Sequence, residues 1–421
     1  MTGNLFGSRL VRVGEGALDN VAGIDAASEV SAGESGLSAA AVDSLWDGVE
    51  AMYRSGAYPA ITFCLRRRGH IVLNRSLGYA RGGGPGEKPG ADARLAEPDT
   101  PVCLFSASKA ITAILVHKLA EEGGIDLDAP VSRYVPEFTG GGKGRTTIAQ
   151  VLSHRGGFPM FNVDPAETGP EILTDWDRCI RLICEAPAQR GGQRLAYHAV
   201  TGGFILAEVI RRVTGAPLTE YLDSRLRKPL GMRYFTYGLD GRSRSRVARN
   251  YAAGHPVRYP ISALARRALT VGFQEVIEVS NEDYFMDAVV PAGNLYATAE
   301  EVSRFYQMLL NDGAYGGQQV LEPETIRRAV RPACRLRFDH TLKIPMRYSE
   351  GLMLGANPVG IYGPMTGRAF GHLGFMNVLG WADPARELSA GLMVSGKAIL
   401  GGHLLPLGQL LSTIAWRCRT A

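Results

Sequence analysis

A serine and a lysine three residues apart form the pair of side chains in this sequence that could start a chemical reaction. Ser106 and Lys109 lie in LFSASKAITAILVHKLAEEGG, residues 104–124, whose apolar spacing predicts a helix. Positions i and i+3 of a helix are surface neighbours with Cβ atoms about 5–6 Å apart, so the hydroxyl and the amine should touch. The two groups could therefore act as a nucleophile and its base.

The amine of Lys109 is expected to point into the protein. The helix face that continues from it carries the small or apolar residues Ala113, Val116 and Ala120. Burial favours the neutral amine, which can accept a proton from the serine hydroxyl. If Ser106 opens the helix, its N–H and the positive helix end would also support an oxyanion. The alternative is that Ser106 only caps the helix and that Lys109 is a surface residue whose ammonium reaches water.

Hydrophobic periodicity predicts the elements that must position this pair. Residues 37–56 show helical spacing behind the candidate N-cap Ser38, and residues 60–80 predict two strands that turn at Arg68-Gly69. Thr298 and Glu301 have capping-box spacing before another helix. Near the C-terminus, strands are expected in GLMLGANPVGIYG, AFGHLGFMNVLGWADP and LSAGLMVSG, and a closing helix in LLPLGQLLSTIAWRC.

Sheet elements at both ends of the chain predict an α+β fold, an α/β sandwich with an antiparallel sheet flanked by helices and an inserted mainly helical region. Residues 1–36, rich in Gly, Ala and Ser, are expected to form an irregular N-terminal extension. The catalytic domain would span 37–421, with 37–124 and 290–421 as its α/β part and 125–289 as the inserted helical region and lid. The basic stretch 240–290 would cover a cleft shaped by Tyr251, Tyr259, Phe273 and Tyr284.

Further segments follow the Ser106–Lys109 helix in a fixed order: TTIAQVLSHRGGFP, LAYHAVTGGFILAEVIRRVTG, PAGNLYATAEEVSRF and FGHLGFMNVLGWADP. In this order they resemble the serine β-lactamase-like and penicillin-binding-protein-like superfamily. That group includes class C β-lactamases, D-alanyl-D-alanine carboxypeptidases, D-aminopeptidases, carboxylesterases and transesterases. The resemblance covers about residues 37–415 and implies the β-lactamase/transpeptidase-like fold.

The resemblance implies roles for four catalytic residues. Ser106 matches the nucleophile and Lys109 the lysine that activates it. Tyr197 matches the tyrosine that acts as general base and passes a proton to the leaving group. A tyrosine beside an ammonium can have its pKa lowered enough to move protons near neutral pH. His372 matches the Lys or His of a K-T-G or H-x-G strand motif, which contacts the substrate carboxylate or the tyrosine.

The same resemblance implies how substrate would be held. The N–H groups of Ser106 and Phe375 would form the oxyanion hole. Gly374 would let substrate lie against the strand edge, and His198 and Leu373 are further candidates for substrate contact.

Two positions depart from the family pattern. Ala199 stands where β-lactamases and penicillin-binding proteins have an Asn that binds the acylamide side chain, and Leu373 stands where the K-T-G motif has its Thr. Both changes remove polar groups that recognise β-lactams or D-Ala-D-Ala, which favours esterases and transacylases.

The predicted function is a serine hydrolase or acyltransferase that forms an acyl-enzyme from an ester, thioester or amide, and most closely an esterase. Alternatives are a biosynthetic transacylase or peptide cyclase, a β-lactamase or D-amino-acid peptidase, and a non-catalytic binding protein of the same fold. The presence of Ser106, Lys109 and Tyr197 together argues against the last of these.

Composition narrows the partners. The net charge of +5 is small and the positive residues of the chain are scattered, so no nucleic-acid partner is expected. The six cysteines show no disulfide or zinc spacing, and no metal or organic cofactor is predicted. A small-molecule acyl substrate is expected, with an acyl acceptor or carrier-bound intermediate as a further option. No signal-peptide core and no run near the roughly 20 apolar residues of a membrane span occur, which predicts no membrane partner and a cytoplasmic location.

Overall fold

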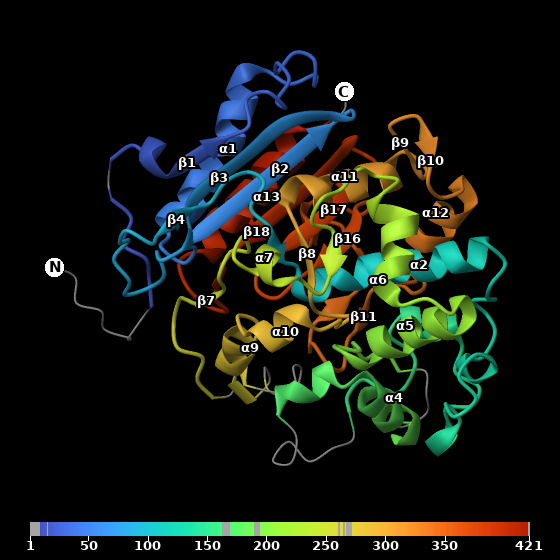
Figure 1. Cartoon of the computed structure of the whole chain (residues 1–421). Coiled ribbons are helices and arrows are strands. Elements are labelled where there is room, and N and C mark those ends of the chain that lie inside the picture. Colours follow the sequence, from blue (N-terminus) through green and yellow to red (C-terminus); the bar gives the residue numbers. More distant parts are fainter. Residues whose placement is uncertain are drawn as a thin grey trace.

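An antiparallel sheet built from both ends of the chain is the scaffold of the fold (Figure 1). The computed structural model describes residues 9–14, 16–161, 169–188, 194–259, 262–263, 266 and 272–419. The strands follow the order β1-β3-β2-β18-β17-β16-β13, and β4 (Arg94–Leu95) pairs with β3. In that order they span Ala22–Ile24, His70–Arg81, Ala60–Arg67, Leu388–Val394, Leu379–Asp383, Phe370–Leu373 and Met353–Leu354.

The two ends of the chain meet at the centre of this sheet. Strands β2 and β18 pair in antiparallel register, with Phe63 opposite Leu392 and Leu65 opposite Ala390. Both strands are buried along their whole length. The α+β fold predicted from the sequence is therefore confirmed.

The predicted turn between β2 and β3 is also confirmed, and its geometry explains its sequence. Arg67 pairs with His70, which leaves a two-residue loop of Arg68 and Gly69. Both loop residues have positive φ, 53° and 82°. Such a turn matches the right-handed twist of the strands it joins, and glycine adopts it without steric cost.

The segment 1–36 is less irregular than its composition suggests. Residues 22–24 form the edge strand β1, in which Gly23 pairs with Ser76. Arg75 and Glu29 form an ion pair with a Nη2–Oε2 distance of 2.7 Å, and this contact fixes the same segment to the sheet. Residues 22–24 form a strand because they pair with β3, and the periodicity of the segment itself did not predict this strand.

Helices cover both faces of the sheet (Figure 1). Helices α1 (Ala39–Arg54) and α13 (Leu404–Arg417) lie together on one face, and α11 (Ala299–Leu310) packs on the other against β2, β17 and β18. The Ser38 side chain accepts the Ala41 N–H at 3.1 Å, as predicted for an N-cap. Thr298 and Glu301 form the predicted capping box at the start of α11.

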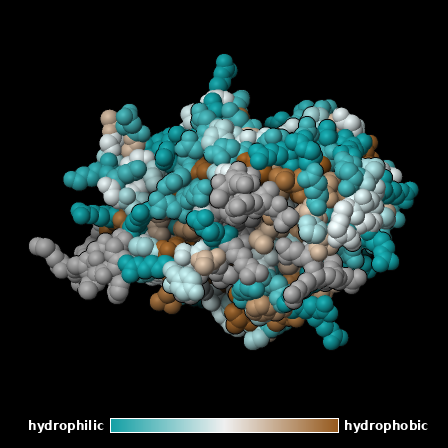
Figure 2. Space-filling model, turned by 90° about the horizontal axis from the view of Figure 1, so that it is seen from below, coloured by the Kyte–Doolittle hydropathy of each residue, from teal (hydrophilic) through white to brown (hydrophobic). Residues whose placement is uncertain are grey.

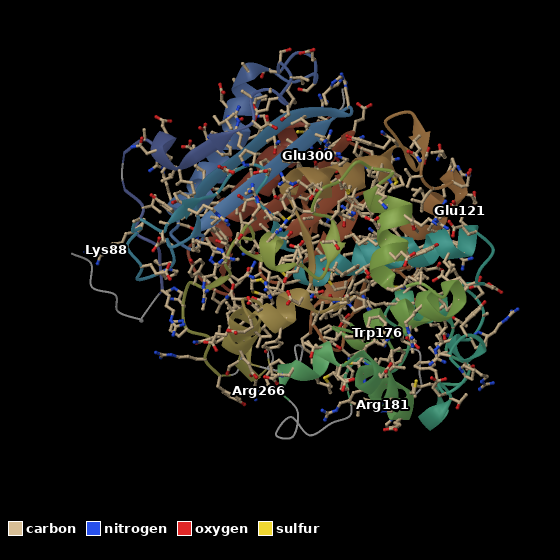
Figure 3. All side chains as sticks on the ribbon, viewed as in Figure 1. Lys88, Glu121, Trp176, Arg181, Arg266 and Glu300 are labelled. Carbon is tan, nitrogen blue, oxygen red and sulfur yellow. The ribbon has the colours of Figure 1, made fainter. Side chains whose placement is uncertain are left out.

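Helix α2 (Ser108–Glu121) runs through the interior between α5 (Thr201–Thr214), α12 (Pro323–Val330) and β16. Every residue of α2 from Ser108 to His117 is buried, so the helix has no solvent face over that length. The sequence predicted one packed face, and the structure encloses the helix on all sides. Glu121 marks its outer end at the edge of the molecule (Figure 3).

The remaining elements are short. The helices are α3 (Ile148–Leu152), α4 (Trp176–Glu185), α6 (Leu218–Leu222), α7 (Gly241–Arg244), α9 (Phe273–Val279) and α10 (Asp283–Asp287), with a π-helical turn at Asp223–Arg227. Single 3-10 turns occur at Asp19–Val21, Phe105–Ala107, Val131–Arg133, Gly140–Gly142 and Pro170–Thr174. Residues 260–261, 264–265 and 267–271 of the predicted lid lie outside the described residues.

Small sheets join these parts. Strands β5 (Val102–Cys103), β8 (Leu295–Ala297) and β6 (Thr236–Tyr237) form one, and β7 (Tyr251–Ala252) pairs with β19 (Gly396–Lys397). Three hairpins complete the structure: β9 (Ala314–Tyr315) with β10 (Gln318–Gln319), β11 (Arg337–Phe338) with β12 (Pro345–Met346), and β14 (Val359–Gly360) with β15 (Gly363–Pro364).

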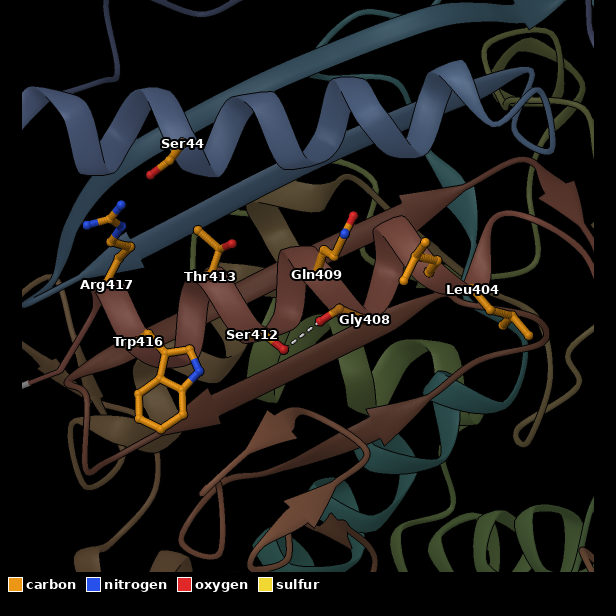
Figure 4. A pocket seen from close by; sticks show the side chains of 9 residues that line it. Ser44, Leu404, Gly408, Gln409, Ser412, Thr413, Trp416 and Arg417 are labelled. Atoms are coloured by element: carbon orange, nitrogen blue, oxygen red, sulfur yellow. Dashed lines mark hydrogen bonds between the residues drawn. The ribbon is translucent and has the colours of Figure 1, made fainter.

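The surface offers little continuous apolar area in the view from below, where hydrophobic residues form small patches within a largely hydrophilic face (Figure 2). Within the described ranges, no helix has the length and apolar character needed to cross a bilayer. On another side, a groove of about 710 Å³ follows α13 beside α1 and is lined by Ser44, Gly408 and Trp416 among others (Figure 4).

The close packing of α1 on α13 depends on Gly48. A Cβ at this position would lie 3.0 Å from Leu410 Cδ1 and 3.5 Å from Leu410 Cα. We expect Gly48→Leu to lower the free energy of unfolding by about 1–3 kcal/mol, because the two helices must move apart. Gly408→Ala on α13 has nothing within 4 Å of its Cβ and should raise stability by up to about 1 kcal/mol through helix propensity. Urea unfolding measures the unfolding free energy of both variants. An equal change in the two variants would contradict the role of Gly48 in helix packing.

Candidate active site

Ser106 and Lys109 are in contact, as their spacing predicted. Ser106 lies in the 3-10 turn directly before α2, and Lys109 lies in the first turn of α2. Lys109 Nζ is 3.0 Å from Ser106 Oγ and donates to the carbonyl of Ala292 at 2.9 Å. Lys109 is only 8% exposed, which excludes the alternative of a surface lysine.

The carbonyl of Ala292 reaches Lys109 because α5 has no side chain at Gly203. A Cβ at this position would lie 2.7 Å from the Cβ of Ala292 and 2.8 Å from its N. The glycine therefore lets the segment before β8 pass directly over α5.

The environment of Lys109 favours the neutral form of its amine. Burial holds the pKa of Lys109 well below its ordinary value. Among the residues that the structure describes, no carboxylate forms an ion pair with it. A neutral amine 3.0 Å from a hydroxyl can accept that proton, which is the requirement for activating Ser106.

Tyr197 lies beside this pair, and its surroundings favour the neutral phenol. Its ring centre is 4.9 Å from Lys109 Nζ, and its hydroxyl is hydrogen-bonded to Ser106. Burial, together with the nearby Asp339 carboxylate, raises the pKa of Tyr197, and the Ser106 hydrogen bond offsets this only in part. The expectation of a lowered pKa is therefore wrong. A neutral phenol in this place can donate a proton to a leaving group.

The buried carboxylate of Asp339 fixes the backbone of Tyr197, and the sequence analysis missed it. Its Oδ1 accepts the N–H groups of Tyr197, Thr341 and Leu342 at 3.2, 2.8 and 2.9 Å. Its Oδ2 accepts the Tyr348 hydroxyl at 3.0 Å, and the rings of Tyr348 and Tyr197 stack with centres 6.5 Å apart. An Asp that bonds the amides two and three residues ahead forms an Asx turn, and this local pattern was the available signal.

His372 lies on β16 and carries no charge near neutral pH. Its Nδ1 is 2.7 Å from the carbonyl of Leu373, so Nδ1 holds the proton and Nε2 is the acceptor. Burial and the nearby Lys109 lower the pKa of His372 to about 3. Its ring centre lies 6.3 Å from that of Tyr197. A neutral imidazole offers no positive charge to a substrate carboxylate, which was one of the two contacts expected of this position.

The end of β16 passes directly against the turn that carries Ser106. A Cβ at Gly374 would lie 2.3 Å from the carbonyl oxygen of Leu104, so only glycine fits this crossing. The crossing brings the backbone of Phe375 alongside the turn at Ser106, where first-turn N–H groups lack acceptors within the helix. The Phe375 ring packs between those of Phe105 and Phe273, with centres 5.4 and 5.1 Å away.

Other residues expected at the substrate surface lie elsewhere. His198 is fully buried, and its Nε2 accepts the Phe158 N–H at 3.3 Å, so it does not present a surface to substrate. Leu373 is half-buried beside the apolar cluster around Tyr197, which also contains Ala199. In the lid, Phe273 reaches the site, whereas Tyr251 accepts the Gly82 N–H and Tyr259 is 84% exposed.

A serine in contact with a buried lysine, with a tyrosine beside them and an antiparallel sheet behind, is the arrangement typical of the β-lactamase-like class of serine hydrolases. Residues 39–402 match the family model described as Beta-lactamase, and the chain belongs to this family. It is similar to an esterase/β-lactamase, LipL, of Mycobacterium tuberculosis, with 30% identity over 70% of this chain and 69% of that protein.

Solved structures agree with this assignment. A family VIII carboxylesterase superimposes with a TM-score of 0.74 at 27% identity, covering 91% of this chain and 98% of its own. A penicillin-binding-protein homologue from Caulobacter crescentus gives a TM-score of 0.73 at 25% identity, covering 90% and 97%. The family thus includes both esterases and relatives of peptidases.

Replacing the buried amine should remove acylation. We expect Lys109→Met to slow acylation of Ser106 by about 10²–10⁴-fold, because the hydroxyl loses its general base. Lys118→Met, on the same helix but paired with Glu121 at the surface end, should leave the rate within about twofold. Stopped-flow release of the leaving group measures both rates, and similar losses in the two variants would contradict the role of Lys109.

Removing Asp339 should loosen Tyr197. In Asp339→Ala, three buried N–H groups and the Tyr348 hydroxyl lose their acceptor, so we expect a loss of at least about 2 kcal/mol in unfolding free energy and a lower kcat. Asp339→Asn keeps an acceptor oxygen and should lie between this variant and wild type. Urea unfolding and steady-state kinetics check the order, and full activity in Asp339→Ala would show that Tyr197 does not depend on this carboxylate.

Proposed function

We propose that the protein is a carboxylesterase that hydrolyses uncharged esters through an acyl-enzyme on Ser106. The observation that carries this proposal is the buried Lys109 amine 3.0 Å from Ser106 Oγ, because burial lowers its pKa and also lowers that of His372 on the neighbouring strand. Among the described residues that face Lys109, Tyr197 and His372, the site has a base for the serine and no cation for a substrate carboxylate.

Each proton has a place to go in this arrangement. As Oγ of Ser106 attacks the ester carbonyl, its proton moves to Lys109 Nζ, and the N–H groups of Ser106 and Phe375 hold the oxyanion. The Tyr197 phenol gives its proton to the departing alkoxide and regains one from the Lys109 ammonium. Water then attacks the acyl-enzyme, passes a proton back by the same route and releases the acid.

The walls of the site favour apolar acyl groups. On one side the rings of Phe105, Phe375 and Phe273 form a row, and on the other Leu373 and Ala199 belong to the apolar cluster around Tyr197. β-Lactams and D-Ala-D-Ala peptides carry a carboxylate and an acylamide group. Ala199 and the neutral His372 provide no strong partner for either group. The esterase names of LipL and of the carboxylesterase structure support the same choice.

The test is intact-mass spectrometry during turnover of p-nitrophenyl butyrate, beside the chromogenic β-lactam nitrocefin. We expect an added butyryl mass that maps to Ser106 and is absent from Ser106→Ala, and a kcat/KM for the ester at least about 10²-fold above that for nitrocefin. Added alcohols compete with water for the adduct and measure acyl transfer. A faster reaction with nitrocefin would overturn the esterase assignment, and the absence of any adduct would overturn the nucleophile.

A further inference from the structure

A small cavity lies behind the catalytic lysine, on the side away from Ser106. Its volume is about 20 Å³, and its polar lining comes from Lys109, Thr112, His154 and His198. A single water needs about 10–15 Å³ on the same scale and two to four polar partners. The cavity therefore has the size and the polarity for one water molecule.

The His198 ring supplies a donor without an acceptor at this place. Its Nε2 accepts the Phe158 N–H at 3.3 Å, so the neutral ring carries its proton on Nδ1. His198 is fully buried. The backbone of Ala196 interacts with its ring, but within the described part of the chain no acceptor lies at Nδ1 with hydrogen-bond geometry. A buried donor of this kind calls for an acceptor in the adjoining cavity.

Lys109 has the matching need. An ammonium has three N–H donors, and Lys109 Nζ contacts two acceptors, Ser106 Oγ and the Ala292 carbonyl. When the amine holds the proton taken from Ser106, its third N–H requires another acceptor inside the protein.

We infer that His198 is a positioning residue that holds one water against Lys109 Nζ. The water oxygen accepts from both Lys109 Nζ and His198 Nδ1. One of its hydrogens reaches Thr112 Oγ1, which lines the same cavity, so the water has three polar partners. The inference rests on the proposed function only in taking Lys109 as the base.

The water stabilises the protonated form of Lys109 and so strengthens it as a base. The titratable groups that face Lys109 are Tyr197 and His198 before α5, His154 after α3 and His372 on β16. The His154 ring is held in place because its Nδ1 accepts the backbone N–H of His198 at 3.2 Å. Burial lowers the pKa of each of the three histidines, so none of them competes with Lys109 for the serine proton.

Two amide variants test the roles of the two His198 ring nitrogens separately. Asn places its amide where Nδ1 lies and so keeps a donor to the water, whereas Gln places its amide where Nε2 lies and keeps only the acceptor for the Phe158 N–H. In His198→Gln we expect the acid limb of the acylation rate to move about one pH unit lower and the plateau to fall about three- to tenfold. In His198→Asn both should stay close to wild type.

A crystal structure of the wild-type protein at high resolution completes the test. We expect a water about 3 Å from both Lys109 Nζ and His198 Nδ1, absent from His198→Gln. A wild-type cavity without a water, or an acid limb that does not move in His198→Gln, would overturn the inference. If wild type forms no acyl-enzyme, the proposed function fails, and the crystal structure still decides whether the water is bound.

Discussion

A buried amine with no counter-charge among the described residues is the constraint on which the rest of the site depends. Lysine is costly to bury as an ammonium, so an interior without an anion beside it favours the neutral form. Helix α2 provides that interior because it is enclosed on all sides over its first ten residues. The histidines around Lys109 are neutral for the same reason, since burial disfavours their charged forms as well.

The buried carboxylate of Asp339, close to Tyr197, does not pair with Lys109. Asp339 directs its oxygens to the Tyr197 N–H, two further amides and the Tyr348 hydroxyl. A carboxylate paired with Lys109 would hold its proton, and Ser106 would then lack a base.

The features that the sequence predicted well are those that neighbours along the chain determine. The hairpin at Arg68-Gly69, the caps at Ser38 and Thr298 and the contact between Ser106 and Lys109 all depend on fixed short spacings. The pairing of the two chain ends followed from strand patterns at both ends. The catalytic roles of these residues, and those of Tyr197, His372 and Phe375, remain predictions.

What the sequence could not show depends on distant contacts. Strand β1 exists because β3 offers it an edge, and Asp339 matters because a hairpin far along the chain brings it to Tyr197. His198 follows Tyr197 directly, yet its side chain turns inward to Phe158. The direction of the Tyr197 pKa shift depends on burial, which the sequence around Tyr197 does not reveal.

The most direct test of the central claim is an NMR titration of the lysine side chains. The sequence has seven lysines, so ¹³Cε labelling gives a small set of signals, and Lys109→Met identifies the one that matters. Burial lowers the pKa of Lys397 to about 7, so its signal could be confused with that of Lys109. Lys397→Met identifies the Lys397 signal separately. The account predicts that the Lys109 signal titrates well below its ordinary pKa, because burial favours the neutral amine. A Lys109 signal that titrates near its ordinary value of about 10.4 would contradict it.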